Sequence, residues 1–120
     1  MALIADAVLD TALNVLITNG DTLNICSAEP ANFAGIAAVD LGNDTVSTTG
    51  PVDGDTDGRK ATVGAITTGS VTGNGTATHW ALSNGTDTLY ATGSLTASQT
   101  VTNGNTFTLD AISITIRDAT

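Results

Sequence analysis

The hydrophobic period of this chain changes once, at Gly20, and that change limits the fold to one helix followed by strands. Before Gly20, apolar side chains cover most of a helical cylinder, and a narrow polar stripe recurs every fourth position at Asp6, Asp10 and Asn14. We therefore predict an N-terminal helix over residues 1–19. We expect Gly20 to end it in the left-handed conformation that commonly closes a helix.

The apolar surface of this predicted helix is too wide to face water. It must pack against the protein's own sheet or against another subunit. Its apolar residues are therefore candidates for a docking or oligomer interface, together with the single tryptophan, whose ring is either a core anchor or an interface hot spot. The candidate interface residues are Leu3, Ile4, Val8, Leu9, Leu13, Leu16 and Trp80.

Short alternating segments separated by turn residues follow the predicted helix. Residues 21–59 predict one strand, at 22–27, and then irregular loops with one short strand or turn. Residues 60–120 predict an antiparallel β body, in which the runs HWAL and LYA flank Asn84-Gly85 as in a hairpin. Threonine at 23 positions and glycine at 13 favour strands and turns over helices. The strands of the body are expected at 60–68, 70–72, 76–82 and 88–92.

These patterns indicate a mainly β fold, an antiparallel β-sandwich or barrel-like domain with one N-terminal α-helix. The length of 120 residues suits a single domain, residues 1–120, around one modest core. The weak echo between TGSVT at 68–72 and TGSLT at 92–96 is interpreted as two equivalent strand starts. Two copies are too few for a solenoid.

The last apolar segment, residues 106–118, changes phase in its middle. Phe107 and Leu109 lie on odd positions, whereas Ile112 and Ile114 lie on even ones. A one-residue shift turns each later side chain to the other face of a strand. The segment must therefore contain a bulge near 110–112, be buried on both sides, or pass from one sheet to another.

The charge balance excludes several kinds of partner. The formal net charge is −9, and Arg59, Lys60 and Arg117 are the whole basic inventory, so no basic patch can bind a row of phosphates or an anionic membrane. No apolar run reaches the roughly 20 residues that span a bilayer.

Cys26 is the single cysteine and is expected to be a small core residue. The N-terminal residues carry aspartates where a secretory signal needs positive charge, so we expect the chain to be made and folded in a cytoplasm without export.

The stretch DGDTDGRK raises the question of a metal site. Asp53, Asp55 and Asp57 alternate as in the first half of an EF-hand calcium loop. The twelfth position of such a loop, normally a glutamate, is Gly64, and two basic residues follow the aspartates directly. A solvated turn in which Arg59 pairs locally with an aspartate is the main prediction. A weak Ca²⁺ site at the three aspartates is the alternative, and no other cofactor is expected.

No catalytic residues are predicted. His79 is the single histidine, and no serine or cysteine nucleophile motif accompanies it. On an alternating strand His79 and Trp80 face opposite sides, one in the core and the other at a surface or interface. We therefore expect a protein that is not an enzyme.

The segments CSAEP at 26–30, GTATHWAL at 75–82 and IxIRD at 114–118 resemble those of small virion proteins of tailed bacteriophages. The resemblance covers most of the chain, and its motifs are structural. It implies a non-enzymatic structural protein on the virion. The leading hypothesis is a capsid decoration (cement) protein, which binds the outside of the shell through the major capsid protein or other virion proteins. We expect a homo-oligomer, with a trimer favoured, and no direct contact with nucleic acid or membrane.

The same resemblance includes head fibres and tail components. The alternative hypothesis is therefore a tail-fibre or head-fibre module that binds a host receptor or glycan. A third hypothesis, a small hydrolase, lacks any base and nucleophile that can be paired.

Overall fold

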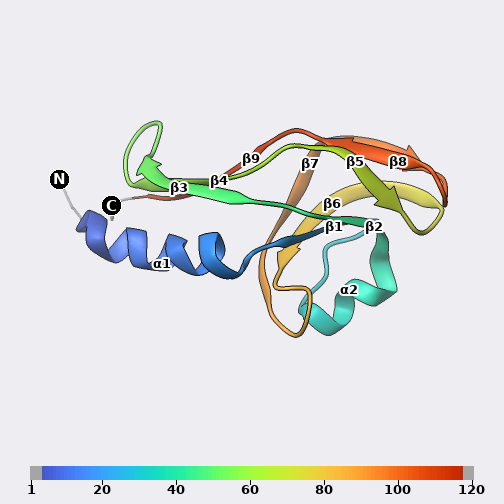
Figure 1. Ribbon diagram of the computed structural model, residues 1–120, viewed down its shortest axis with the longest axis horizontal. Coiled ribbons are helices and arrows are strands. Elements are labelled where there is room, and N and C mark those ends of the chain that lie inside the picture. Colours follow the sequence, from blue (N-terminus) through green and yellow to red (C-terminus); the bar gives the residue numbers. More distant parts are fainter. Residues whose placement is uncertain (1–3, 118–120) are drawn as a thin grey trace.

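A computed structural model describes residues 4–117 of the chain. It confirms a mainly β, antiparallel and barrel-like fold with an N-terminal helix (Figure 1). The elements in chain order are α1 (Asp6–Asn19), β1 (Thr22–Cys26), α2 (Phe33–Val39), β2 (Asp40–Thr45), β3 (Thr48–Asp53), β4 (Arg59–Val63), β5 (Ile66–Val71), β6 (Gly75–Ser83), β7 (Leu89–Val101), β8 (Thr106–Leu109) and β9 (Ile112–Ile116). None of the described helices is long and apolar enough to cross a membrane.

The larger sheet has six strands in the order β7-β6-β1-β2-β5-β8, and all neighbours are antiparallel. The sheet curls, so that its two edge strands approach and the Gln99 Nε2 of β7 donates to the Thr108 carbonyl of β8 at 2.9 Å. The main core lies within this curl. Its buried members include Leu23, Ile25, Val71, Trp80, Leu82, Val101 and Phe107.

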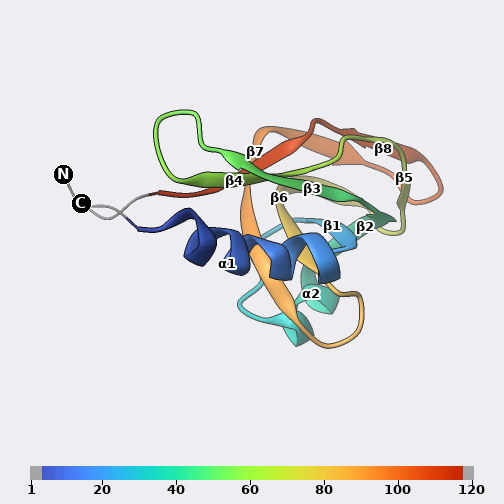
Figure 2. The same ribbon diagram turned by 60° about the vertical axis from the view of Figure 1, so that its left-hand side comes forward.

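The smaller sheet has three strands in the order β3-β4-β9, and α1 packs across β3 and β4 (Figure 2). This order repeats that of the neighbouring strands β2, β5 and β8 in the larger sheet, because β2 leads into β3, β4 into β5, and β8 into β9. Part of the molecule is thus a three-stranded ribbon that continues from one sheet into the other. The body is correspondingly elongated, at 48 × 26 × 23 Å.

Each of the three ribbon strands is interrupted where it changes sheet. The interruptions lie at residues 46–47, 64–65 and 110–111. The phase change of the last apolar segment falls at the third one, so the structure selects passage between sheets among the three predicted explanations. Phe107 of β8 and Ile112 of β9 both contact the main core because the chain changes phase there.

The predicted strand at 60–68 is wrong for the same reason. It is two strands, β4 and β5, separated at Gly64. The Gly64 amide donates to the Ser47 carbonyl at 2.9 Å, which ties two of the interruptions together. The TGSVT and TGSLT echoes are not equivalent strand starts, because TGSVT covers the end of β5 and the residue after it, whereas TGSLT lies in the middle of β7.

The prediction of irregular loops over residues 21–59 is also wrong beyond β1. This region contains α2, β2 and β3. Asn32 caps α2, because its Oδ1 accepts from the Gly35 amide at 2.9 Å, and Ile36 is buried beneath the helix. At seven residues, α2 is too short for a clear helical period, and its stability comes from packing.

The predicted ends of α1 are confirmed only in part. α1 ends at Asn19 as predicted, but it begins at Asp6, so residues 4 and 5 of the helix predicted at 1–19 are not helical. Gly20 has φ −82°, so the left-handed explanation is wrong. A side chain at this position would clash with its neighbours, since an added Cβ would lie 2.7 Å from the Leu16 carbonyl oxygen and 3.1 Å from the Leu82 side chain.

The predicted hairpin around Asn84 is confirmed, with Leu82 of β6 opposite Ala91 of β7.

Candidate functional site

The acidic stretch forms the end of β3 and the loop to β4, and each of its aspartates has a different basic partner. Asp53 Oδ1 lies 2.7 Å from Arg59 Nη1, and Asp55 Oδ1 lies 2.6 Å from Lys60 Nζ. Asp57 pairs with Arg117, which follows β9. All three basic residues of the sequence therefore bind this one loop.

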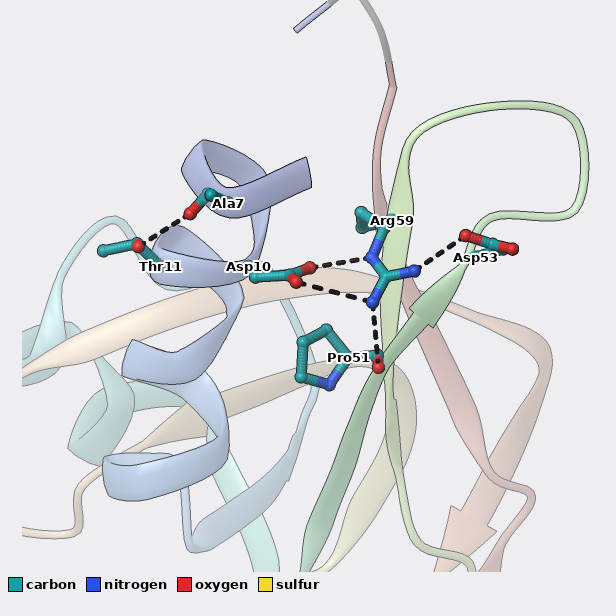
Figure 3. A network of polar contacts seen from close by, with 6 residues as sticks. All are labelled: Ala7, Asp10, Thr11, Pro51, Asp53 and Arg59. Atoms are coloured by element: carbon teal, nitrogen blue, oxygen red, sulfur yellow. Dashed lines mark hydrogen bonds and ion pairs between the residues drawn. The ribbon is translucent and has the colours of Figure 1, made fainter. Parts of the chain in front are cut away.

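Arg59 is the centre of the network because it also holds α1 (Figure 3). Its Nε donates to Asp10 Oδ1 at 2.8 Å, and its Nη2 bonds to Asp10 Oδ2 at 3.4 Å and to the Pro51 carbonyl at 3.3 Å. The two carboxylates raise the pKa of Arg59, with the hydrogen bond to Asp10 as the larger cause. The guanidinium fork thus joins helix, strand and loop.

This network bears directly on the calcium hypothesis. The local pairing of Arg59 with Asp53, predicted from the sequence, is confirmed. Within residues 4–117, no group of three or more His, Cys, Asp or Glu side chains is arranged to hold a metal ion. A cation at Asp53, Asp55 and Asp57 would have to displace the basic partner of each aspartate. Ca²⁺ binding at these residues stays an untested prediction.

The candidate interface residues separate into two faces of α1. Leu9 and Leu13 are buried on the side that packs on β3 and β4, and Leu16 contacts the main core. Leu13 has no exposed surface. The prediction that these leucines form a free docking surface is therefore wrong, because they pack against the protein's own sheets. Leu3 lies outside the described residues.

The valines of α1 are exposed, in contrast to its buried leucines. Val8 is 61% exposed and Val15 46% exposed, and they lie seven residues apart, on one side of the helix. Ile4 lies before the start of α1 and is half-buried, so it is not part of this exposed helical surface. We call Val8 and Val15 the valine stripe. Val15 was not among the predicted interface residues, although its spacing from Val8 could have indicated it.

Trp80 is a core residue rather than an exposed interface anchor. It is 9% exposed and belongs to the main core, and its indole lies against Gly93, where an added Cβ would come within 2.6 Å of the ring. His79 faces the other side of β6 as predicted and is half-buried, with Nδ1 2.9 Å from Thr78 Oγ1.

Two hollows accompany these features. One, of about 530 Å³, lies where β7 faces the β8–β9 junction and is lined in part by Trp80, Leu95, Leu109 and Ile112. It is the open seam of the curled sheet, where residues 95–98 of β7 bulge opposite Thr78. The second, of about 350 Å³, lies between α2 and strands β1, β2 and β6. The sequence analysis identified neither.

Cys26 lies under α2 beside the second hollow. It is fully buried with Ile36 and Ala81 in a small apolar cluster. Burial, and secondarily the charge of Asp40, raise the pKa of the Cys26 thiol to about 11. The thiol is thus protonated and inert at neutral pH, as expected for a core cysteine.

Comparison of this chain with protein-family models, curated proteins and solved structures found no match.

Proposed function

We propose that this protein is a non-enzymatic capsid decoration protein of a tailed bacteriophage, which binds the outside of the capsid and stabilises it. The observation that carries the proposal is the valine stripe, an exposed apolar surface on a helix that is itself held firmly. The sequence resemblance to small virion proteins supports the same assignment. The proposed contacts are with the major capsid protein and with other copies of this chain.

The support behind the stripe is rigid for a physical reason. The inner face of α1 is buried on β3 and β4, and Asp10 is bonded through two oxygens to Arg59. A surface presented on a fixed helix loses little conformational entropy when it binds. Such a surface suits a protein that must bridge neighbouring subunits in one geometry.

The charge distribution fits an external position. Every basic side chain already binds an aspartate, and the formal net charge is −9. The protein therefore has no cationic surface to compete for packaged DNA, and its copies remain soluble at high density. Binding only to the assembled shell would stabilise that shell by mass action.

The stripe is small, so we expect it to work in several copies. Specific interfaces bury about 800 Å² on each partner, more than two valines supply. A trimer in which three α1 helices contribute to one contact, or a joint contact of stripe and capsid, would reach that size. Because the copies repel one another electrostatically, self-association should strengthen as salt increases.

The test uses capsids that lack the protein. Wild-type protein should bind them and raise their resistance to heat and low salt. The double variant Val8→Asp, Val15→Asp should bind at least about ten-fold more weakly, since each change places a charge in the contact. Ala7→Asp with Asn14→Asp is the matched control, because both residues are exposed on α1 outside the stripe.

Absence of capsid binding by correctly folded wild-type protein would refute the proposal. Equal binding by the two double variants would move the contact away from the valine stripe. Light scattering on the free protein would show whether wild type forms trimers that the stripe variant lacks.

A further inference from the structure

We propose that the hollow between α2 and the larger sheet is a binding site for a neutral, hydroxyl-rich ligand of about monosaccharide size. The site is formed by Asn24 of β1, Asp40 and Asn43 of β2, Ser83 of β6, and Phe33 of α2. This inference does not depend on attachment to a capsid.

The first observation is a buried amide that is only half used. Asn24 is 8% exposed and lines the hollow. Its Nδ2 donates to Asp40 Oδ1 at 3.1 Å, but its Oδ1 has no protein donor among residues 4–117. A buried acceptor without a donor is costly, and a ligand hydroxyl would supply the missing bond.

The second observation is the mixture of donors and acceptors around that amide. Asn43, opposite Asn24 in the strand pairing, makes no side-chain hydrogen bond within the described chain. Ser83 is fully buried; its Oγ accepts from the Gly85 amide at 3.1 Å, so its hydroxyl hydrogen is available to donate. Asp40 Oδ1 accepts from Asn24 and from the Gly42 amide, and Oδ2 has no partner among the described residues.

These groups select the class of ligand. A carboxylate, two amides and a hydroxyl can accept from and donate to the hydroxyls of one small molecule. Phe33, Ala34 and Ala37 supply an apolar wall against which the carbon face of a sugar ring can pack. A volume of about 350 Å³ lies at the lower end of the range for small-molecule sites.

The charge around the hollow excludes anionic ligands. All three basic residues bind the loop after β3, within the other sheet. Asp40 itself lines the hollow, so a phosphate, sulfate or acidic sugar would be repelled by its charge with no basic side chain in the hollow to offset it. A neutral saccharide or polyol meets no such penalty.

The test is protein-observed NMR of the full chain with methyl glycosides of neutral hexoses, methylammonium and methylguanidinium as probes. At least one glycoside should shift the amide signals of residues that line the hollow, with a dissociation constant of about 1–10 mM, as expected for one small site. Asn43→Ala should weaken that binding about five- to ten-fold, the value of one hydrogen bond, without unfolding the protein. Asn14→Ala on the exposed face of α1 is the matched control and should bind like wild type.

Asn24→Ala should abolish binding, and its folding is checked by the same spectra. If it unfolds, Asn43→Ala still decides. The proposal is overturned if no glycoside shifts these signals at about 100 mM. It is equally overturned if only the two cationic probes bind, because the site would then receive a basic side chain, or if Asn43→Ala binds every probe like wild type.

Discussion

Aspartate plays different roles in the two sheets of this molecule. Around the smaller sheet, Asp10, Asp53, Asp55 and Asp57 are paired with arginine or lysine. On and around the larger sheet, acidic side chains accept hydrogen bonds from neutral donors: Thr22 to Asp21, Thr92 to Glu29, Asn24 to Asp40, the Thr45 amide to Asp44, and Asn84 to Asp87.

The difference shows how a chain with three cations uses them. The ion pairs Arg59–Asp10 and Arg117–Asp57 connect segments that are distant in sequence, and the other two close the loop after β3 locally. The neutral bonds to Asp21, Asp44 and Asp87 shape local turns and strand ends. Around the smaller sheet, these ion pairs act together with the buried apolar contact of Leu9 and Leu13. The larger sheet is held by its enclosed apolar core. Four predictions test this contrast, in order of decreasing effect.

The first prediction concerns the apolar attachment of α1 to the smaller sheet. Leu13→Ala should lower the free energy of unfolding by about 2–5 kcal/mol, because it leaves a cavity at a fully buried position. Denaturant unfolding measures the change. Val15→Ala, at an exposed position on the same helix, should change it by less than about 0.5 kcal/mol. Equal losses from the two variants would show that α1 does not pack as described.

The second prediction concerns Cys26 in the larger sheet. With a thiol pKa raised to about 11, the native protein should react with thiol reagents near pH 8 at least about a hundred-fold more slowly than the unfolded chain. Asp40→Asn should lower that pKa, since the charge of Asp40 contributes to the shift. Rapid labelling of native protein at pH 8 would contradict the buried position.

The same shift has a consequence at alkaline pH. The thiol pKa is higher in the folded state than in the unfolded chain, so its contribution to stability is complete below the ordinary thiol pKa. It is lost as pH rises from there through about 11. Cys26→Ser tests this: the variant should lack that part of the alkaline loss.

The third prediction compares two cations of the same loop. Arg59→Gln should lower the melting temperature more than Lys60→Gln, because Arg59 joins α1, β3 and the loop, whereas Lys60 meets one exposed aspartate. The difference should shrink in high salt, which screens ion pairs near the protein surface. A larger decrease in melting temperature for Lys60→Gln than for Arg59→Gln would show that Arg59 is not the main connection in this network.

The same two variants sharpen the calcium question. Removing Lys60 frees Asp55, so any weak Ca²⁺ affinity at Asp53, Asp55 and Asp57 should increase in Lys60→Gln. Calorimetric titration of Ca²⁺ into wild type and variant measures it. Binding of equal strength in both would place the ion away from these residues.

The smallest effect is expected at the turn between β6 and β7. Hydrogen bonds from Asn84 and then Thr88 lower the pKa of Asp87. The group's contribution to stability is therefore present above the ordinary aspartate pKa and is lost as pH falls through the lowered value. Asp87→Asn should flatten this acid dependence slightly. Thermal melts between pH 2 and about 6 measure it, and an unchanged profile would contradict the turn geometry.

Local patterns alone determined several parts of this protein. The helix before Gly20, strand β1 and the hairpin around Asn84 could be predicted because each depends on neighbours in sequence: a 3.6-residue period, an alternation, an Asn-Gly turn. The phase change near Asp110 also showed that the last apolar segment could not be one regular strand with a single buried face. The basic residues after the aspartates indicated a locally paired loop.

Other parts were decided only by the tertiary structure. Asp10 and Arg59 are 49 residues apart, and nothing local marks them as partners. The leucines and valines of α1 are equally apolar in sequence, so only the position of β3 and β4 separates the buried face from the valine stripe. The hollow beside Asn24 required strands β1, β2 and β6 to be brought together beneath α2. Burial and long-range pairing are properties of the assembled chain, because they depend on which surfaces exclude water.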